Sequence, residues 1–126
     1  MDLLNTLIGL VLAAVTLAAL AFAGGQEGLP LRHGDYVEAQ TPCQGAPSSS
    51  RLWFGGGFVL HAPHTHCEAR RHHRTGPSAY DVALRCYEQG DRDAPFDRLD
   101  HVVIAGRTDF TLANDFGRGR YRWCGT

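Results

Sequence analysis

Hydrophobic and polar positions divide this chain of 126 residues into two unlike parts. Residues 3–23 form one apolar run, LLNTLIGLVLAAVTLAALAFA, whereas later apolar residues occur singly or in short groups. Such a run at an amino terminus is typical of a secretory signal peptide, and it ends in Ala21-Phe22-Ala23, a small-x-small cleavage pattern. We therefore predict a signal peptide over residues 1–23. The run also approaches the ~20 residues that span a bilayer, so an uncleaved N-terminal anchor helix is the alternative.

The polar part, residues 34–126, is predicted to be a single all-β domain. It has no stretch with a helical apolar period, and its short apolar groups are bounded by Gly, Pro, Asn and Asp. Residues 24–33 contain three Gly and one Pro and are expected to form a flexible linker. The pattern predicts a small antiparallel barrel or sandwich. Its expected strands are Asp35–Gln40, Arg51–Phe54, Phe58–His61, His66–His73, Ala79–Tyr87, Asp100–Ala105, Asp109–Ala113 and Arg120–Cys124.

Two connections between these strands carry predictions of their own. Gly55-Gly56-Gly57 is expected to form a tight hairpin, because glycine adopts positive φ values without steric cost. Residues 88–99 are interpreted as a surface loop, with Phe96 tucked against the core. The carboxylates of Asp97 and Asp100 are accordingly interpreted as solvated.

Four cysteines permit three disulfide pairings, and hairpin geometry favours one of them. Thr75–Ser78 is expected to form a four-residue turn, which places Arg74 opposite Ala79. The same register places Cys67 opposite Cys86, within reach of a disulfide across the hairpin.

Cys43 and Cys124 remain, near the two ends of the domain, and a bond between them would close the fold. Closing loops of about 20 and about 80 residues contributes roughly 3 to 4.5 kcal/mol each in chain-entropy estimates. These bridges matter because a domain of this size has a marginal core. Disulfides persist in oxidising compartments. We therefore predict a periplasmic or secreted protein or, with an uncleaved anchor, one held in the inner membrane and facing the periplasm.

The charge balance argues against two classes of partner. After Ala23 the chain has 12 Arg, no Lys and 12 acidic residues, namely all 13 except Asp2, so this part is formally neutral. Binding to nucleic acid or to an anionic membrane surface needs a cationic surplus. We therefore expect no nucleic-acid partner, and membrane contact only through an uncleaved N-terminal segment.

Histidines gather around Cys67 in the sequence HAPHTHCEARRHH. Imidazole is a ligand for Zn²⁺ and Cu²⁺, and His64 and His66 would share one face of a strand. Because a metal centre needs three or four converging ligands, the candidate set for Zn or Cu is His61, His64 and His66. The alternative, without a cofactor, is a polar edge strand that discourages pairing with other chains. In acid these histidines would charge beside neighbouring arginines and form a cationic patch.

No catalytic signature is found in the sequence. Ser48-Ser49-Ser50 lacks the G-x-S-x-G context of a nucleophile elbow, and no CxxC occurs. Most of the aromatic residues are expected to pack in the core rather than to form a ligand platform. These residues are Trp53, Phe54, Phe58, Tyr121 and Trp123.

Several landmarks together resemble a group of small secreted four-cysteine bacterial proteins of no assigned function. They include Thr41-Pro42-Cys43, His66-Cys67, Tyr80 ahead of Cys86, and the closing Tyr121-Arg122-x-Cys124. The chain departs from the pattern at Gly55, where an Asp or Asn is expected. This resemblance implies a compact disulfide-linked β domain in the periplasm and implies no activity. A second similarity, of architecture alone, is to periplasmic lysozyme inhibitors, whose Ser-Gly-x-x-Tyr motif does not occur here.

These observations favour an exported, non-enzymatic binding or structural module of the cell envelope, including an inhibitor-like role. Its partner would be an envelope protein or a cell-wall ligand of unknown identity. One alternative is a periplasmic metal-binding protein that uses the cluster from His61 to His73. The other is a small hydrolase whose site has no recognised motif.

Overall fold

The computed structural model describes residues 28–89 and 91–126. The signal peptide or anchor predicted over residues 1–23 lies outside these described residues. Within the two described ranges, no helix is long and apolar enough to cross a membrane.

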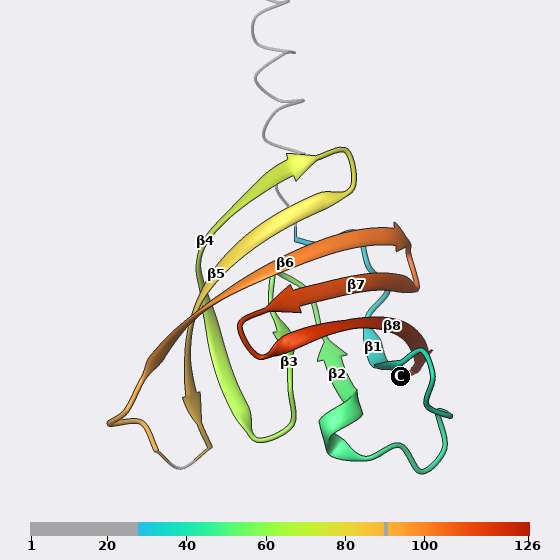
Figure 1. The fold of residues 1–126 in the computed structure, drawn as a ribbon, viewed down its shortest axis with the longest axis horizontal. Coiled ribbons are helices and arrows are strands. Elements are labelled where there is room, and N and C mark those ends of the chain that lie inside the picture. The colour runs from blue at the N-terminus through green and yellow to red at the C-terminus, as the bar shows by residue number, and fades with distance from the viewer. Residues whose placement is uncertain (1–27, 90) are drawn as a thin grey trace, which may run out of the picture.

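The described chain is all-β, as the alternation of polar and apolar residues predicts (Figure 1). On one strand, for example, Val82, Leu84 and Cys86 are buried while the residues between them are not. Each of the expected strands forms; Arg51–Phe54 has the predicted bounds, and the others have shifted ends. The elements are β1 (Gly34–Glu38), the 3₁₀ helix η1 (Ser48–Ser50), β2 (Arg51–Phe54), β3 (Leu60–His61), β4 (Thr65–Gly76), β5 (Ala79–Glu88), β6 (Phe96–Gly106), β7 (Asp109–Asn114) and β8 (Gly117–Gly125).

The strands form one antiparallel sheet in the order β3-β2-β1-β8-β7-β6-β5-β4. This is an up-and-down meander in which β1 pairs with β8, so the sheet curls into a nearly closed barrel. The two ends of the sheet, β3 and β4, are not paired with each other in the described structure. Of the two expected architectures, barrel and sandwich, the structure therefore forms the barrel.

The inward side chains of the strands fill the barrel with an apolar core. Tyr36 and Phe110 meet edge to face with ring centroids 5.1 Å apart, and Phe110 stacks on Tyr121 at 5.4 Å. Burying a side chain of this kind contributes about 1.5–3 kcal/mol relative to its exposure to water. The strand residues of this core are Tyr36, Leu52, Phe54, Leu60, Val102, Phe110 and Leu112.

The first described residues, 28–33, are packed against the barrel and differ from the flexible linker expected there. Leu29 and Leu31 are only 4% and 6% exposed and belong to the core. The indole Nε1 of Trp123 also donates a hydrogen bond to the carbonyl oxygen of His33, at 3.0 Å. Burial of the two leucines holds residues 28–33 against the barrel, whereas residues 24–27 of the predicted linker lie outside the described residues.

The β4–β5 hairpin places Cys67 directly opposite Cys86, and a disulfide joins them (the inner disulfide). The predicted length of the turn between β4 and β5, however, is wrong. Gly76 pairs with Ala79, so the turn contains two residues rather than four. Two register shifts farther along β4 compensate for the shorter turn and bring the cysteines into line. The expected pairing is therefore formed through bulges that simple spacing does not reveal.

A second disulfide, Cys43–Cys124 (the outer disulfide), fastens the loop between β1 and η1 onto the outside of the barrel. Arg122 of β8 holds the same loop, because its Nη2 donates a hydrogen bond to the carbonyl oxygen of Thr41 at 2.6 Å. Val37 of β1 is completely buried although it lies on the opposite face from the core. With no free cysteine among the described residues, the two disulfides indicate an oxidising, extracytoplasmic compartment.

Two connections differ from the sequence-based expectation. β3 begins at Leu60, so Gly55–Val59 form a longer connection in place of the tight three-glycine hairpin. β6 begins at Phe96, so residues 96–99 belong to a strand and not to a surface loop. Asp100 on the same strand is 2% exposed, and its interpretation as a solvated carboxylate is wrong.

Candidate functional site

A cleft of about 550 Å³ opens at one end of the barrel. This end lies at the bottom of Figure 1, where η1 and the turn between β3 and β4 are found. The cleft reaches inward to Leu52, Leu112 and Tyr121, so its depth is provided by the barrel interior. Its volume lies within the ~300–1,000 Å³ that is usual for small-molecule sites. The cleft is therefore the candidate binding site.

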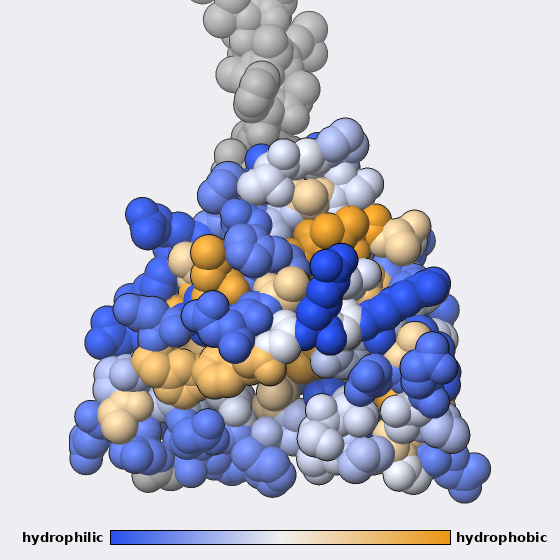
Figure 2. All heavy atoms as spheres, in the orientation of Figure 1, coloured by the Kyte–Doolittle hydropathy of each residue, from blue (hydrophilic) through white to orange (hydrophobic). Residues whose placement is uncertain are grey.

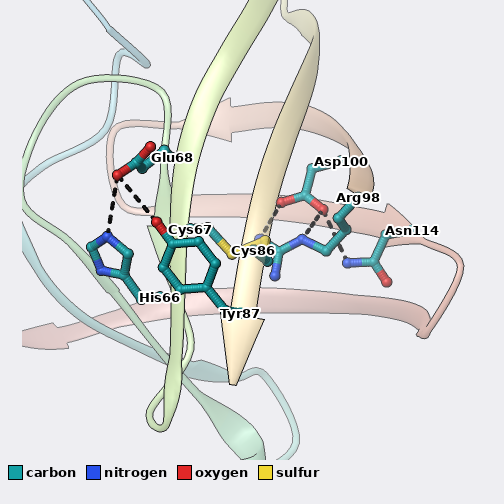
Figure 3. The surroundings of a disulfide bond; sticks show 8 residues. All are labelled: His66, Cys67, Glu68, Cys86, Tyr87, Arg98, Asp100 and Asn114. Atoms are coloured by element: carbon teal, nitrogen blue, oxygen red, sulfur yellow. Dashed lines mark hydrogen bonds and ion pairs between the residues drawn. A yellow bond between two sulfur atoms is a disulfide. The ribbon is translucent and has the colours of Figure 1, made fainter. Parts of the chain in front are cut away.

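A buried ion pair forms part of the cleft wall (Figure 3). The side chain of Arg98 is 9% exposed, and its Nε and Nη2 donate to the two carboxylate oxygens of Asp100 at 2.8 and 2.9 Å. Asn114 adds a third hydrogen bond, from Nδ2 to Asp100 Oδ1, at 3.1 Å. Bidentate pairing fixes the plane of the guanidinium. Arg98 and Asn114 both line the cleft, so the ion pair gives it a rigid polar surface.

An aromatic pair lies at the edge of the cleft. Phe96 and Phe116 meet edge to face with ring centroids 5.9 Å apart, and both line the cleft. Phe116 is 74% exposed, although its backbone is held by a hydrogen bond from its N–H to Asn114 Oδ1 at 2.9 Å. Core packing does not require so exposed a ring. A flat apolar surface beside a polar wall suits a ligand that has both characters.

The remaining polar groups of the cleft carry charges of both signs. Arg51 and Arg118 line it together with Glu38 and Glu88. Burial raises the pKa of Tyr121, and the charge of Glu38 raises it further. The Tyr121 hydroxyl therefore stays protonated at neutral pH and is available as a hydrogen-bond donor. This mixture favours a polar ligand with several hydrogen-bonding groups over a simple ion.

The structure does not assemble the candidate metal ligands His61, His64 and His66. His64 lies in the turn before β4 with a φ of 72°, and its Nδ1 is 3.4 Å from Gln89 Oε1. Since β4 begins only at Thr65, the expected shared strand face of His64 and His66 does not exist. The rings of His61 and His66 are 6.4 Å apart. Across residues 28–89 and 91–126, no group of three or more His, Cys, Asp or Glu side chains is placed to hold a metal ion.

His61 and His66 instead have separate surroundings near the open seam between β3 and β4. Burial lowers the pKa of His61, and the neighbouring His66 and Arg98 lower it further, so His61 is neutral at pH 7. His66 stacks on Tyr87 with ring centroids 5.4 Å apart, and its Nε2 is 3.7 Å from Glu68 Oε1. Figure 3 shows the His66, Glu68 and Tyr87 group apart from the Arg98 ion pair, with the inner disulfide between the two.

The sequence contained a signal for part of this site. Arg98 and Asp100 have the same parity along β6 as Val102, which is buried, so strand alternation places them inward. Two charged residues at inward positions are expected only when they pair. Phe116 gave no such signal. Among the aromatic residues expected in the core, Phe54 is buried as predicted, whereas Trp53 is 49% exposed.

Comparison with family models, curated proteins and solved structures finds no match to this chain. The class of protein is therefore defined by its own architecture. In its described residues it is a small, nearly closed up-and-down β-barrel with two disulfides and a cleft of mixed polar and aromatic lining at one end.

Proposed function

We propose that this protein is an exported, non-enzymatic binding module of the bacterial cell envelope, and that its ligand is a cell-wall glycan fragment bound in the cleft. The single observation that carries the proposal is the cleft itself, in which the exposed Phe116 ring stands beside the rigid Arg98–Asp100–Asn114 wall. The apolar core fills the barrel interior, so the ligand would bind at the open end, where the cleft lies.

The chemistry of the cleft supports a sugar ligand in two ways. Sugar rings have an apolar face that packs on aromatic side chains, which Phe96 and Phe116 offer. Their hydroxyl and amide groups need donors and acceptors together, and the cleft supplies Arg118, Glu88 and the Tyr121 hydroxyl.

The test is a titration of the ¹⁵N-labelled, oxidised protein, as recovered from an exporting bacterial host, with a purified disaccharide-peptide fragment of peptidoglycan. We expect amide shifts at residues that line the cleft, with a dissociation constant below 1 mM. Phe116→Ala should weaken binding at least fivefold. Val103→Ala is the matched control, because Val103 is exposed on the outer face of β6, where Figure 2 shows apolar residues.

Two results would contradict the proposal. One is the absence of cleft shifts at millimolar fragment. The other is binding that Phe116→Ala leaves unchanged, since this would place the ligand elsewhere on the barrel.

A further inference from the structure

One half of β4 is a free strand edge with unusual exposure. From Glu68 to Thr75 every residue is exposed, on both faces of the strand. β4 is the last strand of the sheet, and no described strand pairs with its outer edge. β3 is only two residues long and lies near the start of β4, where His61 approaches His66. The distal half of β4 therefore presents unpaired backbone groups to solvent.

This edge is held in position by the rest of the fold. It pairs with β5 from Thr65 opposite Glu88 to Gly76 opposite Ala79, with bulges at Arg70 and Thr75. His72 stacks on Phe58 of the β2–β3 connection, with ring centroids 3.5 Å apart. Arg74 donates from Nε to the carbonyl oxygen of Gly76 at 3.0 Å. A partner strand would therefore meet a preorganised edge, which lowers the entropic cost of association.

The charge on this segment is of one sign. Residues 69–75 carry three arginines and two histidines and no acidic residue. Their register against β5 sends Arg71 and His73 to one face, and His72 and Arg74 to the other. Cations on both faces oppose pairing with a second copy of the same edge, because like charges would be brought opposite each other. The complementary partner is an extended segment with acidic residues.

We propose that the distal edge of β4 is a docking site for an acidic, extended peptide segment of another protein, which adds to the barrel as a ninth strand beside residues 69–75. Main-chain hydrogen bonds to the free edge provide affinity, and the arginines select acidic side chains. The segment needs about seven residues, the length of the free edge at ~3.3 Å per residue. This site is separate from the cleft and does not depend on the proposed glycan ligand.

The test uses fluorescence anisotropy with a labelled seven-residue peptide in which Glu alternates with Val and Thr. The full oxidised protein is used, again as recovered from the exporting host. We expect a dissociation constant below 100 µM at low salt, weakening as salt rises. A second peptide of the same sequence with every backbone nitrogen methylated cannot donate ladder hydrogen bonds in either register and should bind at least tenfold more weakly.

Protein variants test whether the peptide binds at the edge of β4 or is attracted by the arginines of the protein in general. Arg70→Glu/Arg71→Glu should weaken binding of the Val/Thr peptide at least tenfold. The charge-matched control is Arg32→Glu/Arg107→Glu, since both side chains are exposed and Arg32 stacks on Trp123 of β8 beside Arg107. Phe116→Ala should leave peptide binding unchanged, so that failure of this proposal and failure of the cleft proposal are distinguishable. Far-UV circular dichroism and a urea melt establish that each variant is folded.

The inference is overturned by no binding below 1 mM, by equal binding of the N-methylated peptide, or by equal losses in the Arg70/Arg71 and Arg32/Arg107 variants. A fourth overturning outcome concerns heparin. Heparin serves as the anionic-glycan probe. If heparin binds more tightly than the Val/Thr peptide and displaces it, the segment is a polyanion site and not a docking strand.

Discussion

The buried Arg98–Asp100 pair offers the sharpest test of how this barrel is stabilised. Both side chains are almost completely enclosed, at 9% and 3% exposure, and two charged hydrogen bonds join them. Replacing Arg98 with Met leaves the Asp100 carboxylate buried with only the Asn114 amide as a side-chain partner. Replacing Asp100 with Leu leaves the guanidinium without its counter-ion.

The size of each effect follows from desolvation. Breaking a buried pair from one side costs about 3–5 kcal/mol, because an uncompensated charge stays in the interior. A domain of this length has ~5–15 kcal/mol of total stability, so each single change removes a large share of it. The double variant Arg98→Met/Asp100→Leu removes both charges. Its free energy of unfolding should be within about 1–2 kcal/mol of that of the wild type, and the small loss is due to the missing hydrogen bond from Asn114.

The assay is urea unfolding of the oxidised protein, followed by tryptophan fluorescence, for wild type, both single variants and the double variant. The expected result is strong non-additivity, with a coupling energy of roughly 3 kcal/mol or more. Single variants that each cost less than about 1 kcal/mol, or a double variant whose cost equals the sum of the two, would refute the reasoning. The first outcome would mean that water or mobile side chains compensate the charges, and the second that the two charges are not energetically coupled.

Three further predictions concern the disulfides and the pH dependence of stability. Replacing both cysteines of the outer disulfide with Ala should lower the free energy of unfolding more than the same change at the inner disulfide. The expected losses are about 4.5 and about 3.3 kcal/mol in the chain-entropy limit, because the sequence separations are 81 and 19. Equal urea midpoints for the two variants would contradict this. Burial and the neighbouring His66 and Arg98 lower the pKa of His61 from 6.5. Below pH 6.5 the His61 imidazole therefore binds a proton more readily in the unfolded chain than in the folded chain, so the free energy of unfolding falls as the pH decreases. His61→Gln should reduce the loss of stability between pH 7 and pH 5, measured as urea midpoints at the two pH values. The hydrogen bond from Arg120 holds the pKa of Asp109 below 3.8, so this pair stabilises the fold above pH 3.8 and the contribution is lost as the pH falls below that value. Asp109→Asn should therefore lower the urea midpoint at pH 7, and this difference from wild type should shrink as the pH is lowered below 3.8.

Local pattern predicted much of the barrel. The alternation of Val82, Leu84 and Cys86 with polar residues correctly identified a strand and its buried face. The same rule was available for Arg98 and Asp100, but a charged stretch with Gly and Pro near it suggested a loop. Burial of a charge depends on a partner, and for Asp100 that partner set includes Asn114, on another strand. Such pairing over distance is not encoded in any short window of sequence.

The histidine cluster shows the opposite failure. Spacing alone placed His64 and His66 on one face, whereas the positive φ of His64 ends that regularity at the turn before β4. Three histidines close in sequence therefore do not converge. Backbone conformation at a single turn residue decides where a side chain lies, and the residue type only restricts the choice.

By itself, the sequence determined the all-β class and the approximate position of the described strands, because these depend on period-two burial. It also determined the pairing of the four cysteines, because Cys67 and Cys86 lie opposite each other on one hairpin and only Cys43 and Cys124 then remain to pair. Only the tertiary structure decided that the sheet closes through β1 and β8, that the seam between β3 and β4 stays open, and that Phe116 and the Arg98 wall meet around one cleft. The physical reason is that barrel closure and the cleft arise from contacts between residues far apart in the chain, whose energies depend on three-dimensional packing and not on local propensity.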